Sequence, residues 1–313
     1  MAGVSMAALT VLNLLAYQHA RAMTHFCSGG ERTPRPEALS LAQKAGVLMT
    51  GVTLPRPENQ RTPAELGLAY QQHVFKSADG TRLEAWLVPQ DDSRGVVILF
   101  HGYADKKDSL LAAAKVFHEL GYTTLLVDFR GCGGSGGSET SIGYHEAEDV
   151  VAALAWARQR MVQRRHVLFG ASMGAAAVLR AVGDLGARPG ALVLQYPFDT
   201  LTHSVRHRFE ALHVPVFPAA ELLVFWGGWQ HGFNGFRYNP ADYARQVRCP
   251  TLLMVGDRDE RVTLDDSRRI FDALAGPKQM RIFTGLGHES LLQPRPQEWR
   301  ETVASFLGGL GQS

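Results

Sequence analysis

The chain has 313 residues, 45% of them hydrophobic, so it is long enough to bury a sizeable core in one or two domains. Its 32 basic and 30 acidic residues give a formal net charge of +2 and are dispersed, which excludes a nucleic-acid-binding protein of the clustered basic kind. Three widely separated cysteines, Cys27, Cys132 and Cys249, argue against a disulfide framework or a cysteine-held metal and fit a reducing compartment.

The first segment of the chain is apolar. From Ala2 to Ala20 there is no Asp, Glu, Lys or Arg, and as a helix this stretch would be about 28 Å long, close to the ~30 Å core of a bilayer. The first basic residues, beginning with Arg21, follow it, which would keep the rest of the chain on the cytoplasmic side. The sequence favours a membrane anchor over residues 1–25, with a helix docked on the domain and a cleaved signal peptide as alternatives. Localisation therefore stays open between cytoplasmic and membrane-anchored.

Residues 26–69 form an arm that contains two copies of Pro-Arg-Pro-Glu, at residues 34–37 and 55–58. Between the copies, the spacing of apolar residues predicts one short amphipathic helix, with Leu39, Leu41, Ala42, Ala45 and Leu48 on its apolar side. A proline followed by a glutamate suits the first turn of a helix. We therefore expect the repeats to mark helix boundaries rather than polyproline ligands.

From residue 70 onward, apolar strands alternate with amphipathic helices. Residues 72–77 and 81–88 are strand-like and flank a predicted hairpin turn at Ala78-Asp79-Gly80. Further strands are expected at 95–100, 123–129, 166–169, 191–196, 251–255 and 279–283. Helices are expected at 108–120, 144–159, 175–185, 264–274 and 297–307. The alternation predicts an α/β domain over residues 70–313, with a mostly parallel sheet covered on both faces. Ligands of such sheets bind beyond the carboxyl ends of the strands.

One segment interrupts this alternation. Between Tyr196 and Tyr243 no strand is predicted, and so long an insertion is uncommon unless it is functional. Its apolar residues predict a small helical cap over about residues 200–245. Its aromatic residues are candidates for an apolar substrate pocket, although packing of the cap onto the core would explain them equally well. The four candidates are Phe217, Phe225, Trp226 and Trp229.

The strand predicted at 166–169 runs into Gly170-Ala171-Ser172-Met173-Gly174. A G-x-S-x-G pentapeptide between a strand and a helix is the signature of a nucleophile elbow. The turn is tight, so the flanking residues must be small, and the central serine stands clear of the backbone. Ser172 is the predicted nucleophile.

A serine hydroxyl needs a base to take its proton, and the base needs a carboxylate to orient it. In this kind of sheet the chain order is serine, acid, histidine. The only histidine after Val262 is His288, which follows the last strand and is the predicted base. Three aspartates at strand ends compete as the acid, and we favour Asp259 over Asp257 and Asp199 because its position in the loop lets it reach His288.

The tetrahedral oxyanion needs two backbone N–H donors held ready. One is predicted to be the amide of Met173, directly after the nucleophile. The other is predicted to be the amide of Tyr103, in the loop His101-Gly102-Tyr103-Ala104 that follows the strand at 95–100. We expect His101 to brace this loop rather than to act as the base. The mechanism requires no metal and no organic cofactor.

The ordered motifs resemble those of the α/β-hydrolase family over about residues 72–307. They are His101-Gly102, Asp128-Phe129-Arg130-Gly131, residues 170–174, residues 256–262 and Gly287-His288. Within the family the chain is similar to the branch that holds monoacylglycerol lipases, lysophospholipases and serine aminopeptidases. The resemblance implies an α/β-hydrolase fold, no catalytic role for Asp128-Phe129-Arg130-Gly131, and an acid in a G-x-x-D-x-x-V pattern. Gly256, Asp259 and Val262 match that pattern.

The leading hypothesis is a serine esterase of the carboxylesterase or lipase type, acting through an acyl-enzyme on a small, lipid-like ester. A peptidase or amidase with the same triad is the first alternative, with Glu210 or Glu221 as groups that could hold a substrate amino terminus. A non-catalytic scaffold with the same fold is the second alternative, which an intact Ser/Asp/His order disfavours. Membrane association through residues 2–20 is expected under the anchor interpretation, and no nucleic-acid partner is expected.

Overall fold

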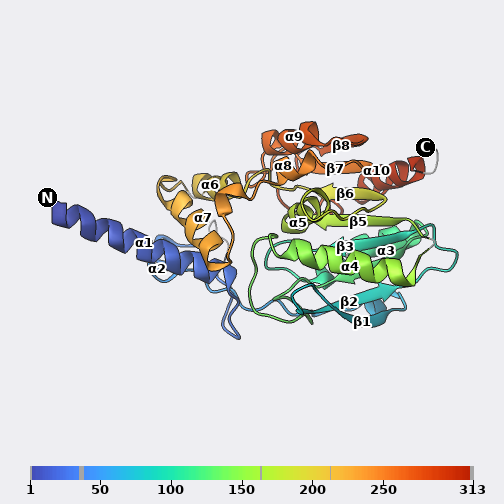
Figure 1. Ribbon diagram of the computed structural model, residues 1–313, viewed down its shortest axis with the longest axis horizontal. Helices are drawn as coiled ribbons and strands as arrows, with labels where there is room; N and C mark the ends of the chain where they lie inside the picture. The colour runs from blue at the N-terminus through green and yellow to red at the C-terminus, as the bar shows by residue number, and fades with distance from the viewer. Residues whose placement is uncertain (1, 35–38, 163, 212, 311–313) are drawn as a thin grey trace.

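The computed structural model describes residues 2–34, 39–162, 164–211 and 213–310, and its centre is one eight-stranded sheet (Figure 1). The strand order is β1-β2-β4-β3-β5-β6-β7-β8, in which β1 and β2 are antiparallel to their neighbours and the other six strands are parallel. The strands are β1 Gln71–Lys76, β2 Arg82–Val88, β3 Val96–Phe100, β4 Thr123–Val127, β5 His166–Ala171, β6 Ala191–Gln195, β7 Thr251–Gly256 and β8 Lys278–Phe283. The prediction of a mostly parallel sheet is confirmed.

Helices cover both faces of the sheet because its central strands are apolar on both sides. In β3, Val97 and Leu99 point into one apolar core, which α3 and α10 complete. Val96, Ile98 and Phe100 point into the other core, which α4, α5 and α9 complete. The period-2 alternation of a strand thus buries every residue of β3. The helices are α3 Leu111–Glu119, α4 Glu146–Arg160, α5 Met173–Gly183, α9 Leu264–Ala273 and α10 Pro296–Gly309.

Between β6 and β7 the chain leaves the sheet and forms helices, as the lack of a strand pattern predicts. They are α6 Leu201–Ala211, α7 Ala219–Gln230, η4 Gly235–Arg237 and α8 Pro240–Ala244. Of these, α8 returns to pack against α5 and α9, whereas α6 and α7 pack on each other beside the carboxyl ends of the strands. Figure 1 shows α6 and α7 (yellow to orange) lying off the sheet edge.

The N-terminal segment is the helix α1 Ala2–Thr24, which projects from the body of the protein in Figure 1. It packs along α7, where Tyr17 lies edge-on to Trp226 with the ring centroids 5.4 Å apart. Leu9, Val11 and Leu14 are exposed. Within the described ranges, no helix combines the length and the apolar character that a bilayer crossing needs.

The arm contains the predicted short helix, α2 Leu41–Thr50, which begins with a capping box at Ser40. Residues 35–38, which hold most of the first Pro-Arg-Pro-Glu copy, lie outside the described residues. The second copy differs from the expectation, because it borders no helix. Pro55 forms a β-bridge with Cys27, and Arg56 donates to the carbonyl oxygens of Gly133, Ser135 and Gly137. The repeat therefore anchors the arm to the glycine-rich loop after β4.

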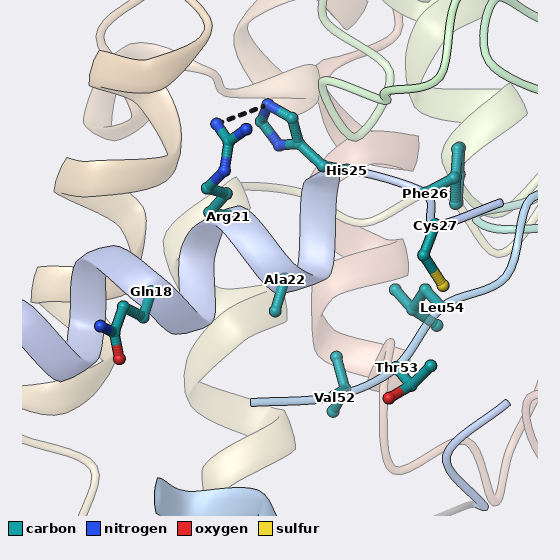
Figure 2. A pocket seen from close by; sticks show the side chains of 9 residues that line it. All are labelled: Gln18, Arg21, Ala22, His25, Phe26, Cys27, Val52, Thr53 and Leu54. Carbon is teal, nitrogen blue, oxygen red and sulfur yellow. Dashed lines mark hydrogen bonds between the residues drawn. The ribbon is translucent and has the colours of Figure 1, made fainter. Parts of the chain in front are cut away.

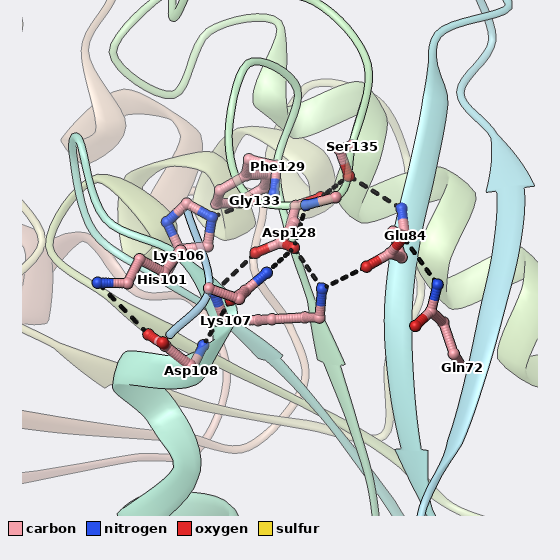
Figure 3. Close-up of polar contacts among 12 residues, drawn as sticks. Gln72, Glu84, His101, Lys106, Lys107, Asp108, Asp128, Phe129, Gly133 and Ser135 are labelled. Carbon is pink, nitrogen blue, oxygen red and sulfur yellow. Dashed lines mark hydrogen bonds and ion pairs between the residues drawn. The ribbon is translucent and has the colours of Figure 1, made fainter. Parts of the chain in front are cut away.

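A buried ion cluster fastens that loop to the sheet (Figure 3). The ammonium of Lys107, which is fully buried, donates to Asp128 and, over 2.9 Å, to Oε1 of Glu84. Its Nζ also lies 4.2 Å from the centroid of the Trp86 ring. Gly134 comes so close to Glu84 that an added Cβ would lie 2.0 Å from Oε1, so a larger residue there would have to displace the carboxylate from the cluster. As the resemblance implies, the role of Asp128 here is structural, because it pairs with the buried ammonium of Lys107.

Lys107→Met should destabilise the protein by about 3–5 kcal/mol, because it leaves the buried carboxylate of Asp128 without its cation and leaves Glu84 with Arg82 as its remaining cation. Urea unfolding followed by far-UV circular dichroism measures the change through the midpoint at constant m-value. Lys106→Met is the matched control, since Lys106 is partly exposed and 3.6 Å from its partner Asp108, and it should cost about 1 kcal/mol or less. Equal losses in the two variants would contradict this account of the cluster.

Acid should destabilise the protein partly through His166, at the start of β5. Its side chain is buried and burial lowers its pKa, a shift that the nearby Arg158 reinforces and the Ala157 carbonyl opposes. As pH falls through about 6.5, the unfolded chain binds a proton that the folded chain does not. Stability from this group is therefore full above that pH and is lost below it, by up to about 1.4 kcal/mol per pH unit. His166→Gln should reduce the slope of unfolding free energy between pH 6.5 and 5; an unchanged slope would refute the assignment.

Candidate active site

The elbow at the end of β5 holds Ser172 in a left-handed backbone conformation, with φ 52°. A non-glycine residue at positive φ costs about 1–3 kcal/mol and persists only where its surroundings enforce it. The surroundings are tight here: a Cβ added to Gly174 would lie 2.5 Å from the carbonyl oxygen of Phe100, and one added to Gly170 would lie 2.7 Å from the backbone of Ala175. Strand, turn and helix therefore meet only with glycine at both positions.

Three predicted side chains, far apart in the sequence, meet at the carboxyl end of the sheet. The Ser172 hydroxyl lies 3.0 Å from Nε2 of His288. Nδ1 of His288 lies 2.6 Å from Oδ2 of Asp259. Because a carboxylate accepts, Nδ1 carries the proton and donates it to Asp259, which leaves Nε2 free to accept the serine proton.

The carboxylate of Asp259 is itself fixed and nearly fully buried, with 1% of its side chain exposed. Its Oδ1 accepts hydrogen bonds from the amides of Arg261 at 2.8 Å and Val262 at 2.9 Å. Neither rejected aspartate reaches His288. Asp257 accepts from the Gly285 amide at the surface, and Asp199 pairs with His203 and Arg269 at the start of α6. Of the three candidate aspartates, Asp259 is therefore the one that contacts His288.

The predicted oxyanion loop lies directly beside the nucleophile. A Cβ added to Gly102 would be 3.7 Å from Cβ of Ser172. In the part of the chain that the structure describes, the amides of Tyr103 and Met173 donate to no acceptor and so remain available. The loop is braced as expected by buried His101, whose Nε2 accepts from the Phe129 amide while Nδ1 lies 2.8 Å from the Gly102 oxygen.

The ring of Tyr103 joins this loop to α1. Its hydroxyl donates to the carbonyl oxygen of Met23, at the C-terminal end of α1, and burial raises the pKa of this phenol to about 12. The group is therefore a stable proton donor at neutral pH. The N-terminal helix thus contributes a contact to the residue whose amide is the predicted oxyanion donor, which no local sequence pattern indicates.

Sequence reasoning also missed Tyr196, which follows β6. Its ring packs against the His288 imidazole, with centroids 4.8 Å apart, and its hydroxyl donates to the carbonyl oxygen of Glu289. Burial raises the pKa of Tyr196. The residue holds the loop that carries His288, and an aromatic residue directly after a buried strand is the signal that could have indicated it.

Two cavities lie beside the C-terminal end of α1. One lies between the end of α1 and residues 52–54; Figure 2 shows Arg21 and His25 on its wall, and none of the predicted site residues lines it. The other, which we call the α6–α7 cavity, lies between those helices, the end of α1 and the loop before α4. Its lining residues are Met23, Thr24, Ser141, Ile142, Leu201, Ser204, Val205, Arg208, Leu223, Val224, Gly227, His231 and Phe233.

The structure brings none of the four predicted pocket aromatics to this cavity. Phe217, Phe225 and Trp229 are exposed, and the indole nitrogen of Trp226 lies 3.3 Å from Oδ1 of Asn13 in α1. The reason is that α7 is apolar all round, so its sequence does not reveal which face turns inward. The inward face carries Leu223, Val224 and Gly227 instead.

A family model described as serine aminopeptidase, S33, matches residues 91–222. An uncharacterized protein of Mycobacterium tuberculosis is 32% identical over 220 residues, covering 69% of this chain and 71% of the relative. The chain belongs to the α/β-hydrolase family.

Other members of the family agree with this assignment. A monoacylglycerol lipase of Mycolicibacterium smegmatis is 24% identical over 270 residues, covering 75% of this chain and 96% of the relative. An esterase of Pyrococcus furiosus has a structure that aligns with a TM-score of 0.69 at 24% identity, covering 81% of this α/β-hydrolase chain and 96% of the other. At that identity the structural match supports the fold, which is the one predicted from the sequence.

Proposed function

We propose that this α/β-hydrolase is a serine hydrolase that cleaves carboxylic esters through an acyl-enzyme. Ser172 attacks the ester carbonyl while Nε2 of His288 takes its proton, and Asp259 stabilises the imidazolium that forms. The amides of Tyr103 and Met173 bind the oxyanion. His288 then returns the proton to the leaving alcohol, and water repeats the sequence to release the acid. The observation that carries the proposal is the continuous hydrogen-bonded series from Ser172 to Asp259.

We propose a domain division to go with this chemistry: an N-terminal helix over 1–25, an arm over 26–69, and a catalytic domain over 70–313 with a cap at about 200–245. The cap would comprise α6 and α7. The α6–α7 cavity is not lined by Ser172, Asp259 or His288, so it would receive the apolar part of the substrate rather than its reacting carbonyl. The walls of that cavity are mainly apolar, which supports an apolar acyl group. The kinship with a monoacylglycerol lipase points the same way.

The structure weighs against the peptidase alternative at the cap. An aminopeptidase needs a free carboxylate to hold the substrate ammonium. The charge of Glu221 is already matched, because Oε1 pairs with the guanidinium of Arg206 in α6, although Oε2 has no hydrogen-bond partner among the described residues. Glu210 is exposed and lines neither cavity.

The test is hydrolysis of p-nitrophenyl esters of increasing acyl length beside amino-acid p-nitroanilides. We expect cleavage of the esters, with kcat/KM rising from acetyl to octanoyl as each buried CH₂ adds binding energy. A strict preference for acetyl would contradict the apolar acyl site. Anilide cleavage with esters ignored would favour the peptidase.

A further inference from the structure

The helix α6 turns one cationic residue into the α6–α7 cavity. Leu201, Ser204, Val205 and Arg208 are spaced i, i+3, i+4 and i+7, so they share one face of the helix, and all four line the cavity. The first three make a mostly apolar wall. Arg208 stands at its far end, one turn beyond Ser204.

Arg208 has no counter-ion. Among the residues that the structure describes, no carboxylate pairs with it and no acceptor takes a hydrogen bond from it, although its guanidinium carbon lies 5.3 Å from the centroid of the Tyr103 ring. Burial lowers the pKa of Arg208, and the charge of nearby Arg261 lowers it further. Arg208 is partly buried, so its guanidinium stays within reach of solvent and of a ligand in the cavity. Charged groups held this way are common where a ligand supplies the missing partner.

Two further guanidinium groups lie near Arg208 and the loop that contains Tyr103 and Ala104. Arg261 follows the predicted acid and also lacks a carboxylate partner among the described residues. Arg32 donates from NH1 to the Ala104 carbonyl oxygen at 3.2 Å, next to Tyr103. Arg208 and Arg32 thus lie near Tyr103, and Arg261 lies near Arg208, so positive charge gathers on this side of the cavity wall and favours an anion over an ammonium group.

The rest of the cavity is apolar, and its walls include Met23, Ile142, Leu223, Val224 and Phe233. A ligand that matches both the apolar walls and the guanidinium of Arg208 needs an apolar chain and one anionic group. Arg208 lies beside the ring of Tyr103, whose amide is the proposed oxyanion donor, so we assign the anionic group to the same molecule as the reacting ester.

We propose that Arg208 is a specificity-determining residue that binds an anionic group, phosphate or carboxylate, in the alcohol part of an amphiphilic ester. The guanidinium offers paired donors that match either group. The assignment of the ligand as a substrate rests on the proposed function. The binding site itself does not, so the two can fail separately.

The binding test uses Ser172→Ala protein and three eight-carbon probes kept below their micelle concentrations: octyl phosphate, octanoate and the neutral octyl glucoside. We expect octyl phosphate or octanoate to raise the melting temperature, and octyl glucoside to raise it less. The relative shifts of the two anions show which group the site prefers. Adding Arg208→Met should abolish the anion-dependent shift, whereas Arg237→Met should retain it, because Arg237 is exposed in η4 and lines neither cavity. A shift that survives Arg208→Met, or equal shifts with the neutral probe, would overturn the proposal.

The kinetic test compares 1-octanoylglycerol 3-phosphate with 1-octanoylglycerol, which carry the same ester. Arg208→Met should lower the ratio of their kcat/KM values by roughly 10- to 100-fold, the loss expected for hydrogen bonds to a charged group. Arg208→Lys should recover part of the ratio, since lysine restores the positive charge but not the paired donors of the guanidinium. An unchanged ratio in Arg208→Met would refute the assignment. If neither ester is cleaved by the wild type while the binding result stands, the proposed function fails and the anion site remains.

Discussion

Ser172→Ala is expected to lower kcat for ester hydrolysis by roughly 10⁴- to 10⁶-fold, the range seen when a triad nucleophile is removed. The variant keeps the imidazole and the two amide donors but has no oxygen to acylate. The fold should be retained, because the side chain makes its one hydrogen bond to His288 and the strained backbone belongs to the turn. Initial rates with p-nitrophenyl octanoate measure the loss.

A fluorophosphonate probe gives an independent readout of the same residue. It should label the wild type covalently and leave Ser172→Ala unlabelled. Ser204→Ala is a matched control, because this serine lines the α6–α7 cavity and no histidine among the described residues hydrogen-bonds to it. Labelling that persists in Ser172→Ala and disappears in Ser204→Ala would place the nucleophile elsewhere.

Asp259→Asn should reduce kcat by about 10⁴-fold while leaving KM comparatively unaffected. An amide in place of the carboxylate can donate to Nδ1 of His288, which would move the ring proton to Nε2 and leave no acceptor for the serine proton. The imidazolium would also lose its stabilising charge. Steady-state kinetics over pH 6 to 9 measures both parameters.

The competing aspartates supply the controls for this experiment. Asp257→Asn removes a surface acceptor of the Gly285 amide, and we expect kcat to change by less than about threefold. Asp199→Asn weakens the pairs with Arg269 and His203, so it should lower stability more than kcat. A loss in either variant as large as that of Asp259→Asn would contradict the proposed acid.

Much of the architecture follows from local pattern. The central strands are continuous apolar runs, as strands buried on both faces must be, and Gly170-Ala171-Ser172-Met173-Gly174 leaves few alternatives to a sharp strand-to-helix turn. Chain order then restricted the predicted base to His288. The strand ends and the helix ends differ from expectation by only a few residues, because fraying and short 3₁₀ turns blur such boundaries.

Contacts between segments that lie far apart in the sequence could not be predicted from local pattern. The choice among Asp257, Asp259 and Asp199 depends on where β7 and β8 carry their loops, which only the packed sheet decides. The inward face of α7 was hidden because every side of that helix is apolar. Arg208 is one of two arginines on α6, and the sequence does not show that it lies beside the Tyr103 ring and lines the α6–α7 cavity, with no carboxylate partner among the described residues.

The sequence by itself therefore determined the α/β-hydrolase fold, the elbow serine and the histidine, because these rest on periodicity, glycine spacing and chain order. Only the tertiary structure decided the partner of His288, the support of the oxyanion loop by α1 and the lining of the cavity. These properties depend on distances between residues far apart along the chain, and local composition does not specify such distances.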